Sequence, residues 1–231
     1  MTGERVKFGV EGLDAMLSGG LPGKNICAVV GTYGTGKTTF ALQFAYEGLS
    51  RGESVIYISL EEREELLRAT MAQKGWDPDV FGDRFYLLRL DPTDFNLAIS
   101  SIKSELPALI RSVKASRVII DPISLFEGLF LDEAARRQEM FRFIEVMRDE
   151  ACTLVLTSET GTANPDGSRY GLVEYLADTV IFLRYVRSAG LTEVHLALEV
   201  VKMRRSPHSR EIKPFEILED RIMVYSEASL F

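Results

Sequence analysis

The sequence feature that most constrains this chain is a glycine-rich loop between an apolar run and a helical pattern. Residues 31–38 read Gly-Thr-Tyr-Gly-Thr-Gly-Lys-Thr, a complete GxxxxGK(S/T) pattern. The apolar run 26–30 precedes the loop, and apolar residues at helical spacing follow it over 37–49. Glycines let consecutive N–H groups turn toward one anion, and the start of a helix adds its positive dipole end. A chance match in a glycine-rich turn would lack this context, so we expect the loop to bind a nucleoside triphosphate.

The expected contacts follow from the chemistry of the loop residues. Lys37 is expected to reach the β- and γ-phosphates, and the Thr38 hydroxyl is expected to ligate Mg²⁺. Five other positions of the loop are expected to contact the nucleotide: Gly31, Gly34, Thr35, Gly36 and Thr39. The motif therefore predicts ATP and Mg²⁺ as the bound cofactors.

Strand-like and helical patterns alternate through the first two-thirds of the 231-residue chain. Apolar runs occur at 26–30, 55–60, 85–90, 117–121 and 153–157, and helical patterns at 37–49, 62–75, 96–114 and 132–150. Such alternation predicts an α/β fold, with a twisted, mostly parallel sheet and helices on both faces. The later strand patterns follow one another through short turns at 188–190 and 219–220, and they lie at 179–185, 194–203, 214–218 and 222–225. These predict antiparallel hairpin strands at the C-terminal end of one domain over 1–231.

The bulk composition excludes several classes of protein. A net charge of −7 and a pI near 5.1 argue against a protein that coats nucleic acid, because that task needs many phosphate-neutralising cations. Cys27 and Cys152 lie in apolar stretches and are expected to be buried, reduced thiols. No apolar run approaches the roughly 18 residues that cross a bilayer. We therefore expect a cytoplasmic protein with no membrane partner.

Acidic residues follow three of the predicted strands at the ends where ligands bind in open α/β sheets. Asp121 ends the run 117–121 in the manner of a Walker B aspartate that holds the metal, although a turn residue before a proline could look the same. Glu61 and Glu62 could orient and deprotonate the attacking water, or they could cap the next helix. Glu159 could sense the γ-phosphate or have only a structural role.

Several segments together resemble the KaiC circadian-clock ATPases. Residues 9–14 (Gly-Val-Glu-Gly-Leu-Asp) and 19–23 (Gly-Gly-Leu-Pro-Gly) precede the phosphate loop as in RecA-like recombinases and KaiC. The features that resemble KaiC specifically are the double glutamate 61–62, the segment 201–208 (Val-Lys-Met-Arg-Arg-Ser-Pro-His), and 169–171 (Arg-Tyr-Gly) followed by Glu174, Tyr175 and Asp178. This resemblance covers essentially the whole chain and implies a RecA-like P-loop NTPase fold. KaiC has two such domains in tandem, whereas this chain has one, as in stand-alone KaiC-like proteins.

The resemblance also implies a hexameric ring with ATP at each subunit interface. Glu61 and Glu62 match the catalytic glutamates of the family, and Lys37 acts with them on the phosphates. Lys202 and Arg204 match cations that a neighbouring subunit presents to the γ-phosphate, where they would act like an arginine finger. The remaining matched positions line the nucleotide: Met203, Ser206 and His208, with Leu218 and Glu219 near the base and ribose.

The chain departs from the family in two places. Arg205 stands where the family has glycine after the arginine, and Pro207 follows shortly after. The resemblance therefore does not specify the path of this loop. Glu174 and Tyr175 occupy the stretch where the kinase half of KaiC carries its acceptors, so autophosphorylation is not expected. A clock role is not implied either. Without the resemblance, the basic segment 202–213 would be interpreted as a solvated hairpin edge.

Two other functions compete with the ring ATPase. A DNA-binding recombinase or helicase-like motor shares the fold, but its candidate DNA loops here are acidic or neutral: 122–135 has no Lys or Arg, and 158–169 has Glu159 and Asp166 against Arg169. A regulatory module that uses ATP as a switch would need a protein partner, for which 125–131 is a candidate surface, although this apolar stretch is more typical of a core segment. The switch reading is compatible with slow hydrolysis. Nucleic acid is not an expected partner.

Overall fold

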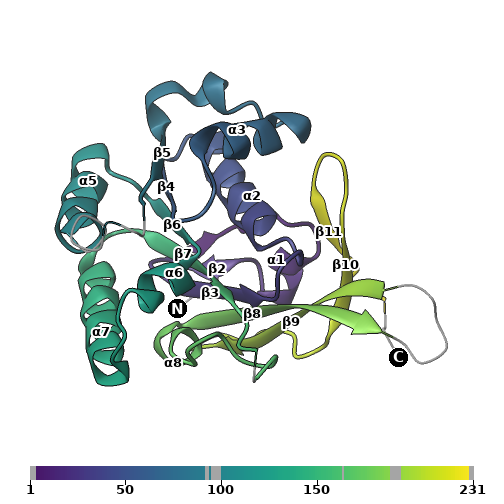
Figure 1. The fold of residues 1–231 in the computed structure, drawn as a ribbon. Helices are drawn as coiled ribbons and strands as arrows, with labels where there is room; N and C mark the ends of the chain where they lie inside the picture. The colour runs from purple at the N-terminus through teal and green to yellow at the C-terminus, as the bar shows by residue number, and fades with distance from the viewer. Residues whose placement is uncertain (1–3, 92–93, 95–99, 163, 188–193, 229–231) are drawn as a thin grey trace.

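A nine-stranded sheet organises the computed structural model, which describes residues 4–91, 94, 100–162, 164–187 and 194–228 (Figure 1). The strands are β1 (Arg5–Val6), β2 (Leu21–Pro22), β3 (Ile26–Gly31), β4 (Val55–Ser59), β5 (Phe85–Arg89), β6 (Arg117–Asp121), β7 (Thr153–Glu159), β8 (Thr179–Arg187), β9 (Val194–Met203), β10 (Lys213–Ile217) and β11 (Ile222–Val224). The helices are α1 (Leu13–Met16), α2 (Lys37–Ser50), α3 (Glu64–Gln73), the 3-10 helix η1 (Pro78–Arg84), the π-helical turn η2 (Ser101–Glu105), α5 (Leu106–Val113), α6 (Ile123–Gly128), α7 (Glu133–Asp149) and α8 (Val173–Leu176).

The order of strands in the large sheet is β11-β10-β9-β8-β3-β7-β6-β4-β5. The six strands from β8 to β5 pair in parallel, whereas β9, β10 and β11 add to the β8 edge in antiparallel pairs. The predicted α/β class, with a mostly parallel sheet and antiparallel C-terminal strands, is therefore confirmed. β1 and β2 form a separate two-stranded ribbon.

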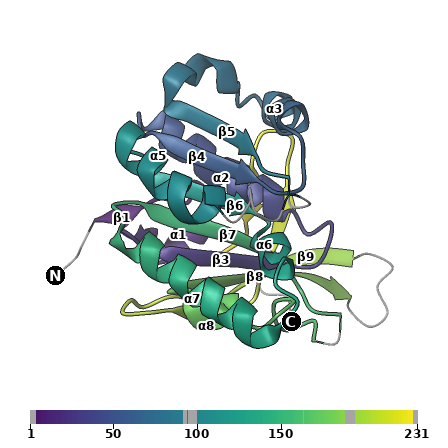
Figure 2. The same ribbon diagram turned by 60° about the vertical axis from the view of Figure 1, so that its left-hand side comes forward.

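Each central strand is buried on both faces because helices cover both sides of the sheet (Figure 2). In β3, Cys27 and Val29 join a core with residues of α2 and α3, while Ala28 and Val30 join a second core with α5 and α7. Alternate residues of a strand point to opposite faces, so a continuous apolar run is what such a strand needs. Cys27 and Cys152 are buried free thiols, as expected.

Two differences from the sequence prediction bear on the site. The helix expected at 62–75 begins at Glu64, because Glu61 and Glu62 lie in a turn before it. The segment 122–135, expected as a loop, contains α6, whose N-cap is Pro122. Pro122 itself is extended, with φ −94° and ψ 143°, and the helix begins at Ile123, so the proline ends the strand run without excluding a helix directly after it. The predicted helix 96–114 is found from residue 100 onward, and the turn 188–190 and residues 96–99 lie outside the described residues.

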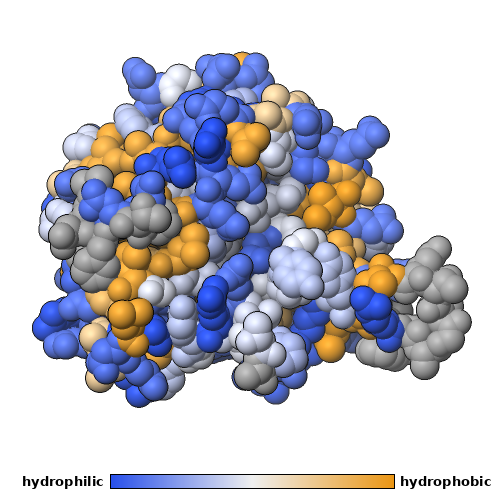
Figure 3. Space-filling model, viewed as in Figure 1, coloured by the Kyte–Doolittle hydropathy of each residue, from blue (hydrophilic) through white to orange (hydrophobic). Residues whose placement is uncertain are grey.

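Apolar side chains remain exposed over part of the helical surface. Phe141 and Val146 of α7 are each 38% exposed, and Leu131 before α7 is 95% exposed. Figure 3 shows apolar colour over the region of α5 and α7 on this face, whereas most of the remaining surface is hydrophilic.

A buried arginine joins three parts of the fold. The Arg117 side chain, at the start of β6, is 1% exposed and forms an ion pair with Glu53 at 2.8 Å. Its guanidinium also donates to the carbonyl oxygens of Lys7 and Phe44 and lies 4.5 Å from the centre of the Phe44 ring. Burial opposes ionisation of Glu53, but the hydrogen bond and charge of Arg117 outweigh it, so the pKa of Glu53 is below its ordinary value. The pair therefore ties the N-terminal segment, α2 and the sheet together.

We predict that Glu53→Ala lowers the free energy of unfolding by about 3 kcal/mol, because it leaves the Arg117 charge buried without its partner. Glu53→Gln keeps a hydrogen-bond acceptor and should lose less. Since the folded pKa of Glu53 is depressed, the stabilisation is present above the ordinary glutamate pKa of about 4.3 and is lost as pH falls through the folded value. Urea unfolding at pH 7 and at pH 3 measures both effects. Equal stability of wild type and Glu53→Ala at pH 7 would contradict the prediction.

Candidate functional site

The phosphate loop connects the central strand β3 to α2, with glycines where the backbone turns. Gly34 has φ 76° and Gly36 has φ 89°, in the left-handed region that favours glycine. A Cβ on Gly36 would lie 2.4 Å from Cδ1 of Ile217. Gly36 is the N-cap of α2 and supplies no side-chain cap, so the first-turn amides of this 14-residue helix remain available to an anion. The loop therefore fits a phosphate group.

Lys37 is the charged residue of this loop. Its Nζ donates to the carbonyl oxygen of Thr32 at 3.0 Å, and the Thr35 hydroxyl donates to the same oxygen at 2.7 Å. Burial lowers the pKa of Lys37, and the negative charges of carboxylates at three strand ends oppose that shift. These carboxylates are Glu159, Asp121 and Glu61. Acidic residues predicted at three separate strand ends therefore act on one lysine.

Asp121 lies at the end of β6 with 4% of its surface exposed. One carboxylate oxygen accepts a hydrogen bond from the Tyr57 hydroxyl at 2.6 Å, and the other accepts one from the Thr157 hydroxyl. Burial and the neighbouring Asp121 charge raise the pKa of Tyr57 well above its ordinary value, so this phenol stays a proton donor. Each oxygen keeps lone pairs for another partner. Together with the Thr38 hydroxyl at the start of α2, Asp121 supplies the oxygen ligands that Mg²⁺ prefers.

Glu61 and Glu62 follow β4 at the same edge of the sheet. They precede the helix, whose N-cap is Arg63 and whose first-turn acids are Glu64 and Glu65. The helix-dipole role is thus filled by the later pair. Burial, followed by the charges of Asp121 and Glu61, raises the pKa of half-buried Glu62. A carboxylate with a raised pKa is a stronger base, which suits the activation of a water molecule.

Glu159, the last residue of β7, lies beside Gly31 in the parallel register. Its carboxylate pairs with Arg169 at 2.9 Å. A hollow of about 950 Å³ opens here beside the phosphate loop, and its lining includes Thr32, Tyr33, Glu159, Tyr170, Arg184 and Tyr185. The predicted carboxylate therefore faces both the loop and this hollow.

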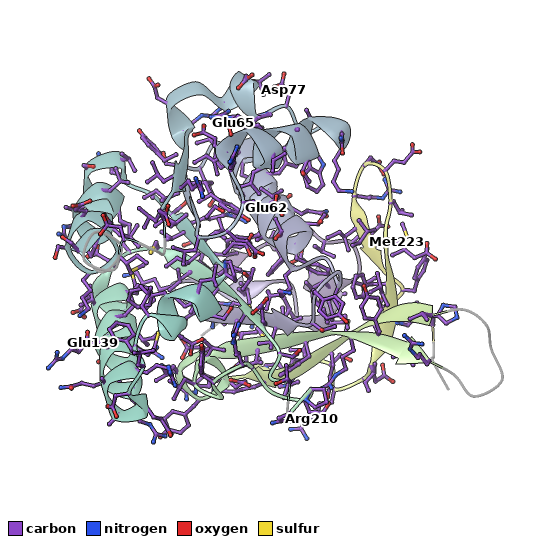
Figure 4. The ribbon with its side chains drawn as sticks, viewed as in Figure 1. Glu62, Glu65, Asp77, Glu139, Arg210 and Met223 are labelled. Atoms are coloured by element: carbon purple, nitrogen blue, oxygen red, sulfur yellow. The ribbon has the colours of Figure 1, made fainter. Side chains whose placement is uncertain are left out.

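The segment 202–208 lies at the opposite end of the strands from the phosphate loop. Met203 pairs with Thr179 at the start of β8, and Thr179 pairs with Cys27 near the start of β3. Four strand residues separate Cys27 from Gly31, which is roughly 13 Å along the strand. In Figure 4, Glu62 lies near the middle of the view and Arg210, which follows this segment, lies at the lower edge. The structure therefore does not bring Lys202 and Arg204 to the phosphate loop of the same chain.

The side chains of this segment are held by nearby residues. Lys202 Nζ contacts backbone carbonyl oxygens of α8 and the residue after it, and Arg204 donates to the Tyr175 carbonyl oxygen at 2.8 Å. Met203 is buried. Ser206 accepts a hydrogen bond from Arg5 at 2.7 Å, and Nδ1 of His208 is buried without a partner among the described residues.

Leu218 and Glu219 belong to the turn between β10 and β11, on the side of the phosphate loop. The neighbouring Ile217 approaches Gly36 of the loop, as the position of a Gly36 Cβ shows. Lys74, just after α3, donates to the Leu218 carbonyl oxygen at 2.7 Å, and Glu219 is exposed. These two positions therefore lie at the phosphate-loop end of the strands, whereas the segment 202–208 lies at the opposite end.

Sequence reasoning missed the hydroxyl partners of Asp121. Tyr57 and Thr157 each interrupt an otherwise apolar strand run, and that interruption was the available signal. A polar group buried in a strand needs a hydrogen-bond partner, so each predicts a polar neighbour on the next strand.

Comparison with known proteins agrees with this geometry. A family model described as "ATPase: KaiC" matches residues 6–229. The chain belongs to the KaiC ATPase family. It is 30% identical to the circadian clock protein KaiC3 of Synechocystis over 96% of this chain, but it spans only 45% of that protein's length. It is 31% identical to a UPF0273 protein of Pyrococcus horikoshii, covering 98% of this chain and 96% of the relative. The crystal structure of a KaiC-like protein of P. horikoshii superposes with a TM-score of 0.85 at 31% identity, over 96% of this chain and 99% of that one.

No helix among the residues that the structure describes is both long and apolar enough to cross a membrane.

The backbone at Arg205 fits the glycine that the resemblance to KaiC implies at this position. Arg205 has φ 59°, so a residue with a side chain occupies a left-handed backbone in this KaiC-family chain. That conformation costs a non-glycine residue roughly 1–2 kcal/mol. The loop keeps the left-handed turn even without the glycine.

We predict that Arg205→Gly raises the free energy of unfolding by about 1 kcal/mol, because glycine adopts this backbone without steric cost. Arg205→Ala is the matched control, since it removes the charge but keeps Cβ, and it should not stabilise the fold. Chemical denaturation of the three proteins measures the difference. Equal stabilisation by alanine and glycine would assign the effect to charge instead of backbone.

Proposed function

We propose that this chain hydrolyses ATP at the interfaces between subunits of a homo-oligomeric ring, which we take to be hexameric. The observation that carries the proposal is the division of its charged groups between the two ends of the parallel strands, which we call the two edges of the sheet. The phosphate loop, Asp121 and the glutamates 61–62 share one edge, and Lys202 and Arg204 occupy the other. A head-to-tail contact between such edges repeats around a ring.

In this proposal the first edge binds the nucleotide and activates water. The α2 amides and Lys37 bind the phosphates, and Thr38 with Asp121 would hold Mg²⁺, which neutralises phosphate charge when bound. Glu62 accepts the proton of the attacking water. The pKa of Glu62 is raised by burial and by the charges of Asp121 and Glu61. The β10–β11 turn, with Leu218 and Glu219, lies where it can flank the base and ribose.

The second edge completes the site of a neighbour. Lys202 and Arg204 lie at the end of the strands that is far from the phosphate loop of their own subunit. Any phosphate loop that they contact therefore belongs to another subunit. Two cations arriving there stabilise charge on the transferring phosphoryl group. Met203, Ser206 and His208 would line the same nucleotide from that side.

We predict that Arg204→Ala binds ATP normally but hydrolyses it about a hundredfold more slowly, because a donor to the transition state is lost. Glu62→Gln should also bind ATP and turn over poorly. A mixture of the two should regain turnover, because a variant with its own Glu62 can meet an intact Arg204 on its neighbour. Phosphate release and particle size, with and without Mg-ATP, measure the outcome.

Lys37→Ala is the control for the nucleotide site itself. It should lose ATP binding, and mixing it with Glu62→Gln should restore no turnover, since both variants are defective in the same half of the site and no subunit then has both Lys37 and Glu62. Wild-type turnover of Arg204→Ala, or full activity of a strictly monomeric protein, would refute the shared site.

The two candidate DNA loops, 122–135 and 158–169, support a DNA-binding motor less well than a ring ATPase. Arg169 pairs with Glu159, and Arg184 beside them pairs with both Asp166 and Glu199, so these cations are already neutralised. Segment 122–135 carries no Lys or Arg. A groove for single-stranded DNA needs free positive charge to track the backbone.

We therefore predict that single-stranded DNA shows no saturable binding at about 1 µM protein at physiological salt, where basic grooves still bind. Fluorescence anisotropy of a labelled oligonucleotide over a salt series measures this. Near-micromolar binding that weakens steeply with salt would favour the motor.

We propose a regulatory or signalling role for the ring, without autokinase activity. The Glu174 carboxylate is engaged by the backbone and hydroxyl of Ser168, and it stands where a phosphate acceptor would be required. Of the candidate partner surface 125–131, Phe126, Glu127 and Phe130 are buried, whereas Gly128 and Leu131 are exposed, so a protein partner would contact only part of it.

A further inference from the structure

Asp178 is a buried carboxylate at the edge of the sheet that carries Lys202 and Arg204. It lies between α8 and β8 and is 5% exposed. Its oxygens accept hydrogen bonds from Arg148 at 3.1 and 3.2 Å and from the backbone N–H of Ile26 at 3.2 Å. Arg204 Nη1 lies 3.6 Å away, and the Arg204 N–H donates to the Asp178 carbonyl oxygen at 2.8 Å. One residue thus contacts Arg204 through both its side chain and its backbone.

The residues around Asp178 hold the second cation as well. Lys202 Nζ donates to the carbonyl oxygens of Glu174 at 2.7 Å and Ala177 at 2.6 Å, while Arg204 donates to that of Tyr175. We call the segment 174–178 the cation seat. The Arg204 side chain is still 41% exposed, although its guanidinium contacts Tyr175 through Nη2 and Asp178 through Nη1, so the anchored group also reaches the surface.

Asp178 is also the anion at the centre of a cluster of positive charge. Burial lowers the pKa of Lys202, the charges of Arg204 and Arg148 lower it further, and those of Asp178 and Glu174 oppose the change. Like charges at close range disfavour each other's ionised forms, and an intervening carboxylate opposes that effect. Asp178 therefore offsets part of the repulsion that the two arginines exert on Lys202.

The hydrogen bond to Ile26 connects the seat to the nucleotide site of the same subunit. Ile26 is the first residue of β3, and Gly31 at the other end of that strand begins the phosphate loop. The central strand thus fixes the separation between the two halves that a ring must match.

We propose that Asp178 is a positioning residue, which holds Lys202 and Arg204 in the arrangement that meets the triphosphate of the neighbouring subunit. The inference rests on the proposed shared site and names a residue that acts through its two cations. Displacement of a reacting group by about 1 Å can cost a hundredfold in rate, so anchoring of the cations matters as much as their charge.

Asp178→Asn tests this, because it keeps the shape and the backbone hydrogen bonds but removes the charge. ATP affinity should be unchanged and kcat should fall about tenfold or more. Turnover should recover when Asp178→Asn is mixed with Glu62→Gln, whose seat is intact. It should not recover with Arg204→Ala, because both variants are then defective in the same half of the site. A general loss of stability would not produce this pattern.

The pH profile is a second readout. Removing the Asp178 charge lowers the pKa of Lys202, so the alkaline limb of kcat should move to lower pH in Asp178→Asn. Asp178→Glu keeps the charge but moves it by one methylene, so it should leave that limb in place while lowering kcat, with the same mixing pattern. It also provides the test if the asparagine variant does not fold.

Glu150→Gln is the matched control, since Glu150 is 6% exposed and pairs with Arg111 of α5. It should retain wild-type kcat and pH profile. If Arg204→Ala is rescued by Glu62→Gln but both Asp178 variants turn over like wild type, or are not rescued by Glu62→Gln, the positioning role is wrong and the shared site stands. If Arg204→Ala itself has wild-type activity, the shared site fails first.

Discussion

The parallel register of β3, β4, β6 and β7 is the constraint on which the site depends. Gly31 lies opposite Glu159, and Ser59 lies opposite Asp121. Because Ile120 lies opposite Leu156, β3 and β7 extend two residues beyond β4 and β6 at the same end of the sheet. Side chains alternate between faces along a strand, and a slip of one residue would send Asp121 to the wrong side of the sheet. The hydrogen bonds of Tyr57 and Thr157 to Asp121 hold the three strands β4, β6 and β7 at that register. Chemistry at this edge is thus a consequence of sheet geometry.

The reversed direction of β9 produces the other half of the arrangement. A parallel strand would have delivered the residues after it to the phosphate-loop edge, whereas an antiparallel partner of β8 returns the chain to the opposite edge. Lys202 and Arg204 are placed there by topology before any side-chain contact is considered. In the proposed shared site, the chain carries two incomplete halves that face opposite directions. Two copies combine them in that proposal, and repetition of one such contact would generate a ring.

Local patterns predicted most of this fold, and long-range contacts limited the rest. The phosphate loop, the strand runs and Asp121 could be predicted because each is encoded within a few neighbouring residues. Tyr57 and Asp121 are separated by 64 positions, so their hydrogen bond depends on strand order and register, which no local pattern specifies. The same is true of Arg117 with Glu53. Helix α6 was missed for a different reason, because Pro122 was interpreted as the beginning of a loop, whereas it is the extended N-cap of a helix that begins one residue later.

The binding of the two cations to backbone carbonyls bears on how such a ring can assemble. A free lysine or arginine side chain has about 2 kcal/mol of rotamer entropy to lose when it is ordered at an interface. Lys202 and Arg204 are already held by carbonyl oxygens of 174–177, so much of that entropy is lost on folding and not on association. Pre-organised groups of this kind leave more of the interaction energy for binding. The left-handed backbone at Arg205 is a further cost met on folding, because a strained turn persists only where surrounding contacts fix it.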